Sequence, residues 1–358
     1  MKNDYCVIMG GGIGSRFWPF SREYRPKQFL DFFGVGRSLI QQTFDRFNQI
    51  IPTENIYIAT NKNYAKLVKE QLPEISDNQI LLEPTRRNTA PCIAYSAYRI
   101  QAINPNANIV VTPADHLILH EQNFLKNIQK GLNFVAKFPS LLTLGVKPNR
   151  PETGYGYIQT QEGGTDNIQK VKAFTEKPNY ELAKVFYESG EFFWNSGIFI
   201  WNVQTILDAF RKYLPDMANC LSQAPAPYNT PEEAAFIEEQ YPMVQNISID
   251  YGIMEKADNA YMLMADFGWS DLGTWGSLYD LSKKDDYQNA VLKCKSLFVE
   301  SKGNLLTLPE KKLAVIQGLD DYIIAESDEI LLICKKTDEQ RIKQFVADIS
   351  MKFGEEYL

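Results

Sequence analysis

The first half of the chain alternates short apolar runs with longer amphipathic segments, and this pattern restricts the fold more than any other feature. Segments with helical spacing, such as Ser38–Gln49 and Ala90–Ile103, separate several of the runs. The runs themselves have the length of β-strands: Tyr5–Met9, Ile56–Thr60, Ile80–Leu82, Ile109–Thr112 and Leu141–Val146. Near-continuous apolar strands alternating with helices predict an α/β fold with a mostly parallel sheet covered on both faces. Ligands of such sheets bind beyond the carboxyl ends of the strands.

From about Gly154 the pattern changes to strands joined by helices without the regular alternation. Strands are predicted over Tyr155–Thr160, Val171–Glu176 and Ile198–Trp201. Helices are predicted to begin at Asn179 and at Thr230. The segment Thr-Pro-Glu-Glu at Thr230 has capping-box spacing with proline at the first helical position. These elements continue to about residue 285, and we predict that residues 1–285 form one domain.

The end of the chain has a third pattern. The polar residues 282–289 predict a linker. Turn residues then separate short β-type runs every eight to ten positions: Leu305–Leu308, Ala314–Gln317, Tyr322–Glu326 and Ile330–Cys334. This spacing predicts a small all-β module over residues 290–358, open or resembling a β-helix. A closing helix is predicted, with a capping box at Thr337 and Gln340 and with one apolar face formed by Ile342, Phe345, Val346 and Ile349.

Composition excludes several classes of function. The 358 residues carry a net charge of −7, whereas nucleic-acid-binding domains are usually strongly basic, so we expect no nucleic-acid partner. Five cysteines without a Cys-x-x-Cys pair favour free thiols in a reducing compartment over a disulfide framework or a zinc site. The apolar run before Gly10 is too short for a signal peptide, and no run has the length of a membrane span. We therefore expect a cytoplasmic protein that does not associate with a membrane.

A glycine-rich segment directly follows the first predicted strand. It contains Gly10, Gly11, Gly12, Gly14, Ser15 and Arg16, and Lys27 follows further along the chain. Glycines at such a turn let backbone amides approach phosphate oxygens. The spacing fits neither the dinucleotide fingerprint, whose third glycine is replaced by Ser15, nor a Walker A loop. A tight structural turn is the alternative explanation of the glycines, but two cations just downstream could clamp a triphosphate.

The sugar-nucleotide pyrophosphorylases have a signature that this segment resembles. The matching residues are Gly11-Gly12-x-Gly14-x-Arg16-x-Trp18-Pro19-x-Ser21, continuing into Pro26-Lys27-Gln28-Phe29. Trp18-Pro19 and Lys27-Gln28-Phe29 resemble the mannose-1-phosphate guanylyltransferase branch in particular. The resemblance is dense over about residues 4–280. It implies a Rossmann-like, mostly parallel mixed sheet of the nucleotidyltransferase type, with residues 1–285 as the catalytic domain and with GTP and mannose 1-phosphate as substrates.

Further segments agree with the family in order and spacing. One segment resembles the family's nucleotide-binding segment and contains Glu83, Pro84, Arg87, Asn88 and Thr89. A helix N-cap at Asn88 or Thr89 is a competing or additional role. Asp115 follows a predicted strand and by itself would be expected to cap the next helix. The resemblance instead implies that Asp115 and Asp271 are the two ligands of Mg²⁺ or a similar divalent cation, which favours oxygen ligands and phosphates.

The two histidines, His116 and His120, lie four positions apart and could suggest a metal pair. A structural role is preferred for both, because phosphoryl transfer to an already anionic nucleophile needs no imidazole base.

The resemblance also implies a binding wall for the sugar phosphate. Its residues are Gly145, Gly154, Tyr155, Glu176, Lys177 and Asn195. Glu176 would accept sugar hydroxyls and Lys177 would bind the sugar phosphate, with a surface ion pair as the alternative for these two. Ordinary turns are the alternative explanation for the glycines and for Asn195. The block Ile249–Lys256 also matches the family, but we assign no individual residue within it.

The implied reaction is in-line attack by mannose 1-phosphate on the α-phosphorus of GTP, with Arg16, Lys27, Asp115 and Asp271 as catalytic residues. Two alternatives stay open: a different pair of nucleoside triphosphate and sugar 1-phosphate, or a non-catalytic regulatory relative that binds nucleotide sugar. Such a relative would be expected to lose a metal aspartate or a loop cation, and all four residues are present.

Many family members continue into a cupin-type phosphomannose isomerase domain, and we do not expect that second activity here. The C-terminal module could mediate contacts in a homo-oligomer or cover the active site of a neighbouring subunit.

Overall fold

The chain folds into two compact units whose segments interleave along the sequence. The computed structural model describes residues 3–161, 164, 166–222 and 227–358. The first unit contains Met1–Gly11, Thr43–Ala114 and Ile118–Trp269, and the second contains Gly12–Gln42, Asp115–Leu117 and Ser270–Leu358. The predicted domain boundary between residues 285 and 290 stays a prediction. None of the helices in the described ranges combines the length and apolar character that crossing a membrane requires.

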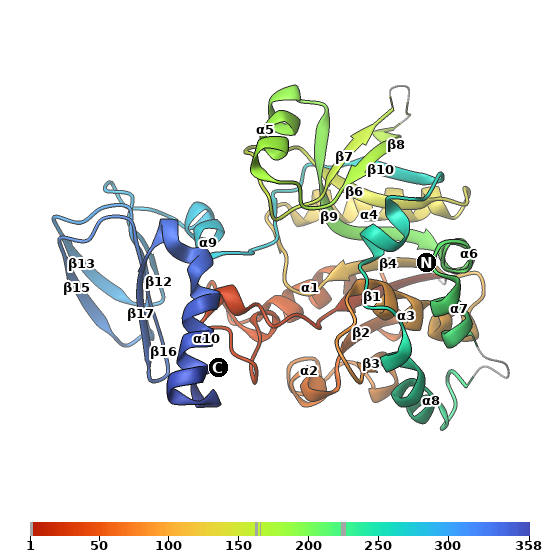
Figure 1. The fold of residues 1–358 in the computed structure, drawn as a ribbon, viewed down its shortest axis with the longest axis horizontal. Coiled ribbons are helices and arrows are strands. Elements are labelled where there is room, and N and C mark those ends of the chain that lie inside the picture. The colour runs from red at the N-terminus through yellow and green to blue at the C-terminus, as the bar shows by residue number, and fades with distance from the viewer. Residues whose placement is uncertain (1–2, 162–163, 165, 223–226) are drawn as a thin grey trace. The chain divides into compact units, whose positions relative to one another are not determined.

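A nine-stranded mixed sheet lies at the centre of the first unit, in the order β3-β2-β1-β4-β9-β6-β10-β8-β7 (Figure 1). Its strands are β1 (Asp4–Met9), β2 (Ile56–Asn61), β3 (Ile80–Glu83), β4 (Asn108–Pro113), β6 (Leu141–Val146), β7 (Tyr157–Thr160), β8 (Ile168–Thr175), β9 (Phe192–Asn202) and β10 (Ala260–Met264). Strands β8 and β9 run antiparallel to their neighbours. The other strands point the same way, so the predicted α/β fold with a mostly parallel mixed sheet is confirmed.

Helices cover both faces of this sheet. They are α1 (Leu39–Asn48), α2 (Ala65–Gln71), α3 (Thr89–Ile103), α4 (Glu121–Val135), α5 (Tyr180–Ser189), α6 (Val203–Tyr213), α7 (Pro215–Leu221) and α8 (Glu233–Gln240). On one face, Phe199 and Trp201 of β9 share a core with α3, α6 and α7. On the other face, Gly131 of α4 lies so close to β9 that an added Cβ would be 2.5 Å from Ile200 Cδ1. Two covered faces explain why the central strands are apolar at nearly every position.

Short helical turns occur in the segments that connect the strands and helices. Those of 3₁₀ type are Ser15–Phe17, Lys27–Phe29, Thr53–Asn55, Lys62–Tyr64, Asp77–Gln79, Tyr241–Met243, Lys336–Arg341 and Glu355–Tyr357, and Asp250–Met254 forms a π-turn. The two-residue strands β5 (Leu117–Ile118) and β11 (Trp269–Ser270) lie where the chain passes from one unit to the other.

Two of the three predicted helix starts differ from the structure. Asn179 caps α5 as expected, because its side chain accepts a hydrogen bond from the Leu182 amide. The capping box at Thr230 is wrong: α8 begins at Glu233, whose buried carboxylate accepts from the Asn229 amide and pairs with Arg99 instead. The capping box at Thr337 is also wrong. Residues Lys336–Arg341 form a 3₁₀ turn, and α10 begins only at Ile342.

The second unit contains the predicted C-terminal β module. Its strands are β12 (Ala290–Leu292), β13 (Lys295–Val299), β14 (Leu305–Thr307), β15 (Leu313–Gln317), β16 (Tyr322–Ser327) and β17 (Ile330–Lys335). Strands β12, β14 and β16 pair in parallel, as do β13 and β15, and this repeated parallel pairing is the pattern of a β-helix. At successive turns the buried Asn289 side chain accepts from the Asn304 amide, and the Asn304 side chain accepts from the Tyr322 amide. This ladder satisfies backbone donors that burial would otherwise leave without partners.

The module shares one hydrophobic core with the loop that follows the glycine-rich segment. Leu305, Ile323 and Ile342 are fully buried in the same cluster as Phe17 and Trp18. Helices α9 (Trp275–Leu281) and α10 (Ile342–Phe353) complete this core. The predicted apolar face of α10 is confirmed: Ile342 is buried, and Phe345, Val346 and Ile349 pack against the cluster. The part of the glycine-rich segment from Gly12 onward and the C-terminal module therefore belong to the same unit.

Candidate active site

The glycine-rich segment divides between the two units. In the first unit, the Gly10 amide donates to Ala59 O and the Gly10 carbonyl accepts from Thr60 Oγ1, both at 2.8 Å. In the second unit, Gly14 has a φ of 66°, and a Cβ at this position would lie 2.5 Å from Lys27 Cβ. Only glycine suits both the left-handed backbone and the close approach of Lys27.

A cavity of about 320 Å³ in the second unit collects several of the predicted phosphate and metal residues. Predicted residues that line it are Gly14, Ser15, Arg16, Lys27, Asp115 and Asp271. Asp115 and Asp271 are 156 positions apart in the sequence, and the fold brings both to one cavity. The second unit therefore brings these two aspartates to the same cavity by itself.

Lys27 connects the two aspartate segments. Its side chain is only 4% exposed, and its Nζ lies 3.0 Å from Asp115 Oδ2. The same Nζ donates to the backbone carbonyl of Asp271 at 2.6 Å. Burial, the largest single effect, would raise the pKa of the Asp115 carboxyl, but the charge and hydrogen bond of Lys27 together with the nearby His116 lower the pKa below its ordinary value. Asp115 is therefore an oriented carboxylate at neutral pH.

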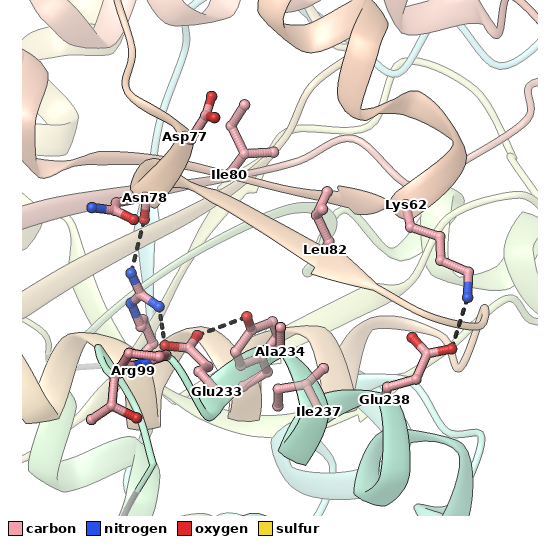
Figure 2. A pocket seen from close by; sticks show the side chains of 13 residues that line it. Lys62, Asp77, Asn78, Ile80, Leu82, Arg99, Glu233, Ala234, Ile237 and Glu238 are labelled. Carbon is pink, nitrogen blue, oxygen red and sulfur yellow. Dashed lines mark hydrogen bonds and ion pairs between the residues drawn. The ribbon is translucent and has the colours of Figure 1, made fainter.

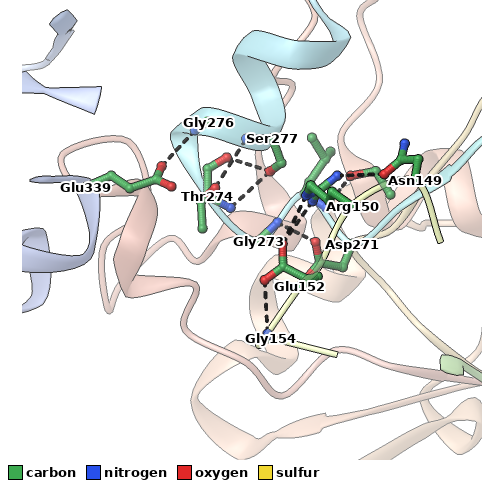
Figure 3. A network of polar contacts seen from close by, with 12 residues as sticks. Asn149, Arg150, Glu152, Gly154, Asp271, Gly273, Thr274, Gly276, Ser277 and Glu339 are labelled. Atoms are coloured by element: carbon green, nitrogen blue, oxygen red, sulfur yellow. Dashed lines mark hydrogen bonds and ion pairs between the residues drawn. The ribbon is translucent and has the colours of Figure 1, made fainter. Parts of the chain in front are cut away.

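Contacts with neighbouring residues hold the Asp271 segment in place. Asp271 Oδ1 accepts a hydrogen bond from the Gly273 amide at 2.8 Å (Figure 3). The intervening Leu272 is fully buried with a φ of 45°, an unfavourable conformation for a bulky residue that persists only where the surroundings fix it. Thr274 and Ser277 then form the capping box of α9. Strain of this kind next to a carboxylate is typical of functional sites.

Arg16 adds a positive charge to the cavity. Its Nε is buried and has no hydrogen-bond partner within the described ranges. Buried polar groups are normally paired, so a buried donor without a partner at a cavity wall is consistent with a ligand that supplies the acceptor.

The donor set of the cavity fits Mg²⁺ better than a transition metal. Asp115 and Asp271 supply two carboxylates and His116 also lines the cavity, but no cluster of three or more His, Cys, Asp or Glu side chains suited to a metal ion occurs in the described part of the chain. Mg²⁺ is commonly held by one or two carboxylates together with waters and substrate phosphates, whereas structural zinc requires a full protein ligand set.

The predicted nucleotide segment of the first unit begins with a buried carboxyl at the end of β3. Glu83 is 7% exposed, and the Tyr241 hydroxyl donates to its Oε1. Its Oε2 faces Gly11, where an added Cβ would lie 3.2 Å away. Burial raises the pKa of Glu83 to about 7, although the bond from Tyr241 opposes the shift. Glu83 and Gly11 therefore come together as neighbours at the same edge of the sheet.

Arg87, Asn88 and Thr89 all make structural contacts. Asn88 caps α3 through Oδ1, which accepts from the Thr89 amide. Thr89 Oγ1 accepts from the Ile249 amide at 2.9 Å, and Arg87 donates to the Pro242 carbonyl. The N-cap alternative is thus confirmed for Asn88. Pro84 is buried beside Glu83.

The raised pKa of Glu83 predicts that the protein loses stability between about pH 5 and 7. In this range the unfolded chain has already released the Glu83 proton while the folded protein still holds it. The free energy of unfolding should therefore fall by about 1.4 kcal/mol per pH unit from this residue, to a total of about 3 kcal/mol. Glu83→Gln should remove this contribution, as measured by urea unfolding at several pH values. Glu239→Gln, exposed on α8, is the matched control, and equal slopes in wild type and Glu83→Gln would contradict the prediction.

The predicted sugar-phosphate residues gather around Asn195 on β9. Asn195 is buried; its Oδ1 accepts from Thr143 Oγ1 at 2.9 Å and its Nδ2 donates to Asp250 Oδ1 at 2.9 Å. Glu176 lies 2.9 Å from Lys177 Nζ, and its side chain is only 7% exposed. Burial and the neighbouring Glu176 raise the pKa of Asp250 to about 7. The group combines hydrogen-bonding oxygens with one exposed cation, which suits hydroxyls next to a phosphate.

The glycines of the predicted sugar wall have packing roles. A Cβ at Gly145 would lie 2.1 Å from Met262 Sδ of the neighbouring strand. The Gly154 amide donates to Glu152, which also accepts two bonds from Arg150 (Figure 3). Tyr155 is buried edge-on against the rings of Trp194 and Trp269. These contacts shape the wall, and the polar side chains of the predicted group are those of Glu176, Lys177 and Asn195.

A second cavity of about 320 Å³ lies between β3 and α8, and none of the predicted site residues lines it (Figure 2). Its charged side chains are already paired: Arg99 with Glu233 and Lys62 with Glu238 within the lining, and Asp77 with Lys69 outside it. The lining therefore offers no unpaired cation for a phosphate.

Three residues near these groups received no role from the sequence. Asp250 lies in the Ile249–Lys256 block, where the family resemblance was a signal that we did not resolve to a residue. Tyr241 and Lys343 had no local signal, because Tyr241 contacts Glu83 and Lys343 lines the cavity of Lys27, Asp115 and Asp271 only through the tertiary structure.

Comparison with known proteins adds independent findings. Residues 5–288 match the model of a family described as nucleotidyl transferase. Mannose-1-phosphate guanylyltransferase 2 of Escherichia coli O157:H7 is 36% identical over 365 aligned residues, which cover 99% of this chain and 75% of that protein. Mannose-1-phosphate guanylyltransferase of Salmonella muenchen is 37% identical, covering 95% of this chain and 72% of that protein.

The fold is matched by a solved structure over nearly its full length. The crystal structure of mannose-1-phosphate geranyltransferase from Thermus thermophilus superposes with a TM-score of 0.88 at 27% identity. The match covers 97% of this chain and 99% of that one. It includes the strand-rich C-terminal region as well as the α/β sheet.

Proposed function

The chain belongs to the nucleotidyl transferase family, and on this basis we propose that it transfers GMP from GTP to mannose 1-phosphate, giving GDP-mannose and pyrophosphate. The observation that carries the chemistry is the position of Lys27. Its ammonium bonds to Asp115 and to the Asp271 carbonyl in a cavity that Gly14 and Arg16 also line. The charges that nucleotidyl transfer from a triphosphate requires are thereby gathered in one place.

The reaction is a displacement at the α-phosphorus of GTP. A phosphate oxygen of mannose 1-phosphate forms the new bond, and the bond to the β-phosphate bridging oxygen breaks, releasing pyrophosphate with its electron pair. The nucleophile is already an anion, so no side chain has to remove a proton. Catalysis then consists of alignment and of stabilising negative charge.

We assign the leaving pyrophosphate to Arg16, Lys27 and the amides of the Gly12–Ser15 segment. Arg16 has a buried donor without a partner in the described part of the chain, and Lys27 is held in place by its contacts. Gly10 and Gly11 complete the nucleotide-binding backbone in this proposal. Asp115 and Asp271 are the residues that would hold Mg²⁺. The ion, when bound, would supply positive charge to the phosphate oxygens.

We assign base recognition to the Glu83 segment, which continues through Pro84, Arg87, Asn88 and Thr89. Guanine presents adjacent N–H donors on its base-pairing edge, and a carboxyl group is a suitable acceptor for them. Tyr241 occupies one oxygen of Glu83, while the other faces Gly11. This arrangement supports a base edge bound beside the start of the glycine-rich segment.

We assign the mannose 1-phosphate to the group around Asn195. Glu176 and Asn195 would contact sugar hydroxyls, and Lys177, which is 61% exposed, would bind the phosphate. Gly145, Gly154 and Tyr155 form the wall in this proposal. Burial is the largest single effect on Lys177 and would lower its pKa, but Glu176 together with Asp250 and Tyr251 raises the pKa above its ordinary value, so this side chain is cationic at neutral pH.

The test of the proposed function is pyrophosphate release from each of the four ribonucleoside triphosphates, with either mannose or glucose 1-phosphate and with MgCl₂. We expect GTP with mannose 1-phosphate to give the highest kcat/KM. Higher turnover with another pair would assign a different specificity, and no release with any pair would contradict nucleotidyl transfer.

We also propose that the protein acts in the cytoplasm without nucleic acid. All five cysteines are free, and burial raises the pKa of the Cys6 and Cys92 thiols, which keeps them unreactive.

A further inference from the structure

The phosphate cavity is also lined by Lys343, a residue of the closing helix α10. Resting on the proposed function, we propose that Lys343 is a third phosphate-binding cation, contributed by the C-terminal module, that contacts the leaving pyrophosphate. This gives the module a direct part in the active site of its own chain.

Two contacts just before Lys343 in the sequence fix the position of its backbone. Ile342, the residue before it, is fully buried in the core that contains Phe17 and Trp18. In the turn just before α10, Glu339 accepts from the Gly276 amide at 2.7 Å and so ties this turn to the start of α9 (Figure 3). These contacts hold the first turn of α10 against the glycine-rich loop, while the Lys343 side chain remains exposed.

The chain that follows the glycine-rich segment is also tied to the C-terminal module through Arg22. The guanidinium of Arg22 is 4% exposed and donates to Glu329 Oε1 at 3.0 Å and to the Ser327 carbonyl at 3.1 Å. A buried charge of this kind is strongly destabilised when its partners are removed. The loop and α10 therefore keep a defined spacing, so a cation on α10 can reach a ligand that the loop binds.

The charge balance of the cavity favours this role. Lys27 is compensated by Asp115, whereas Lys343 has no ion-pair partner within the described ranges. Arg16, Lys27 and Lys343 together exceed the two aspartates by one positive charge. A triphosphate or pyrophosphate carries several negative charges. An exposed ammonium at the cavity wall is therefore available to bind such an anion.

The experiment compares wild type with Lys343→Gln, Lys343→Arg and Lys352→Gln. The last removes one charge from the exposed end of the same helix and is the matched control. We expect Lys343→Gln to raise the KM for GTP, and for pyrophosphate in the reverse reaction, by about tenfold, the effect of one charged hydrogen bond. The KM for mannose 1-phosphate should change by less than about twofold. Lys343→Arg should recover most of the loss, and Lys352→Gln should match wild type.

A calorimetric titration with pyrophosphate and MgCl₂ separates this inference from the proposed function. Weaker pyrophosphate binding by Lys343→Gln than by wild type supports the inference whichever sugar the enzyme uses. Equal affinities in the two proteins, or an equal loss in Lys352→Gln, would overturn it. An unchanged thermal unfolding midpoint in Lys343→Arg confirms that the fold is intact.

Discussion

Replacing Asp271 by asparagine should lower kcat by about 100-fold or more while leaving the fold intact. Asparagine keeps the Oδ1 acceptor for the Gly273 amide, so the loop before α9 retains its hydrogen bond. The change removes only the negative charge that we assign to the divalent cation, and the loss of such a charge costs several kcal/mol of transition-state stabilisation. Turnover should be measured under saturating GTP and mannose 1-phosphate over a series of MgCl₂ concentrations.

The matched control for this variant is Asp280→Asn, the same chemical change at an exposed position of α9. It should have wild-type turnover and wild-type dependence on MgCl₂. A thermal unfolding midpoint close to that of wild type is expected for both variants. Near-normal turnover of Asp271→Asn would remove this residue from the metal site and would leave Asp115 as the sole assigned ligand.

Replacing Gly14 by alanine should have an effect of similar size through the backbone. A Cβ at this position would lie 2.5 Å from Lys27 Cβ, and the φ of 66° is itself unfavourable for alanine. The loop must shift to relieve the clash, which moves Lys27 away from Asp115 and from the Asp271 carbonyl. We expect kcat to fall by about 100-fold and the free energy of unfolding to fall by about 2 kcal/mol.

Gly36→Ala is the control that distinguishes the effect of the clash with Lys27 from the effect of a positive φ. Gly36 also has a positive φ, of 81°, but no described atom lies within 4 Å of its added Cβ, and it does not line the cavity. This variant should lose about 1 kcal/mol of stability and keep its activity. If Gly14→Ala behaved like Gly36→Ala, contact with Lys27 would not be the reason for glycine at position 14.

Much of the fold could be predicted because its signals are local. The strand over Leu141–Val146 and the helix ending at Ile103 follow from the periodicity of apolar residues, and the structure has both. The two wrong capping boxes failed because capping motifs report only local preference. At α8 the reason is tertiary: Glu233 has the right spacing to cap the helix, but its carboxylate is buried and pairs with Arg99, an interaction across 134 positions. A buried ion pair can override the local preference.

The amino-acid sequence by itself identified the family and predicted the glycine-rich loop, Asp115, Asp271 and Lys27 as site residues, because the family motifs that contain them are residue types at fixed short spacings. Only the tertiary structure decided which side chains meet. It placed Lys27 between the two aspartate segments, the Tyr241 hydroxyl on Glu83, Asp250 against Asn195 and Lys343 at the phosphate cavity. The physical reason is that burial, charge compensation and pKa depend on groups distant in the sequence, and their positions are fixed by the packing of the core.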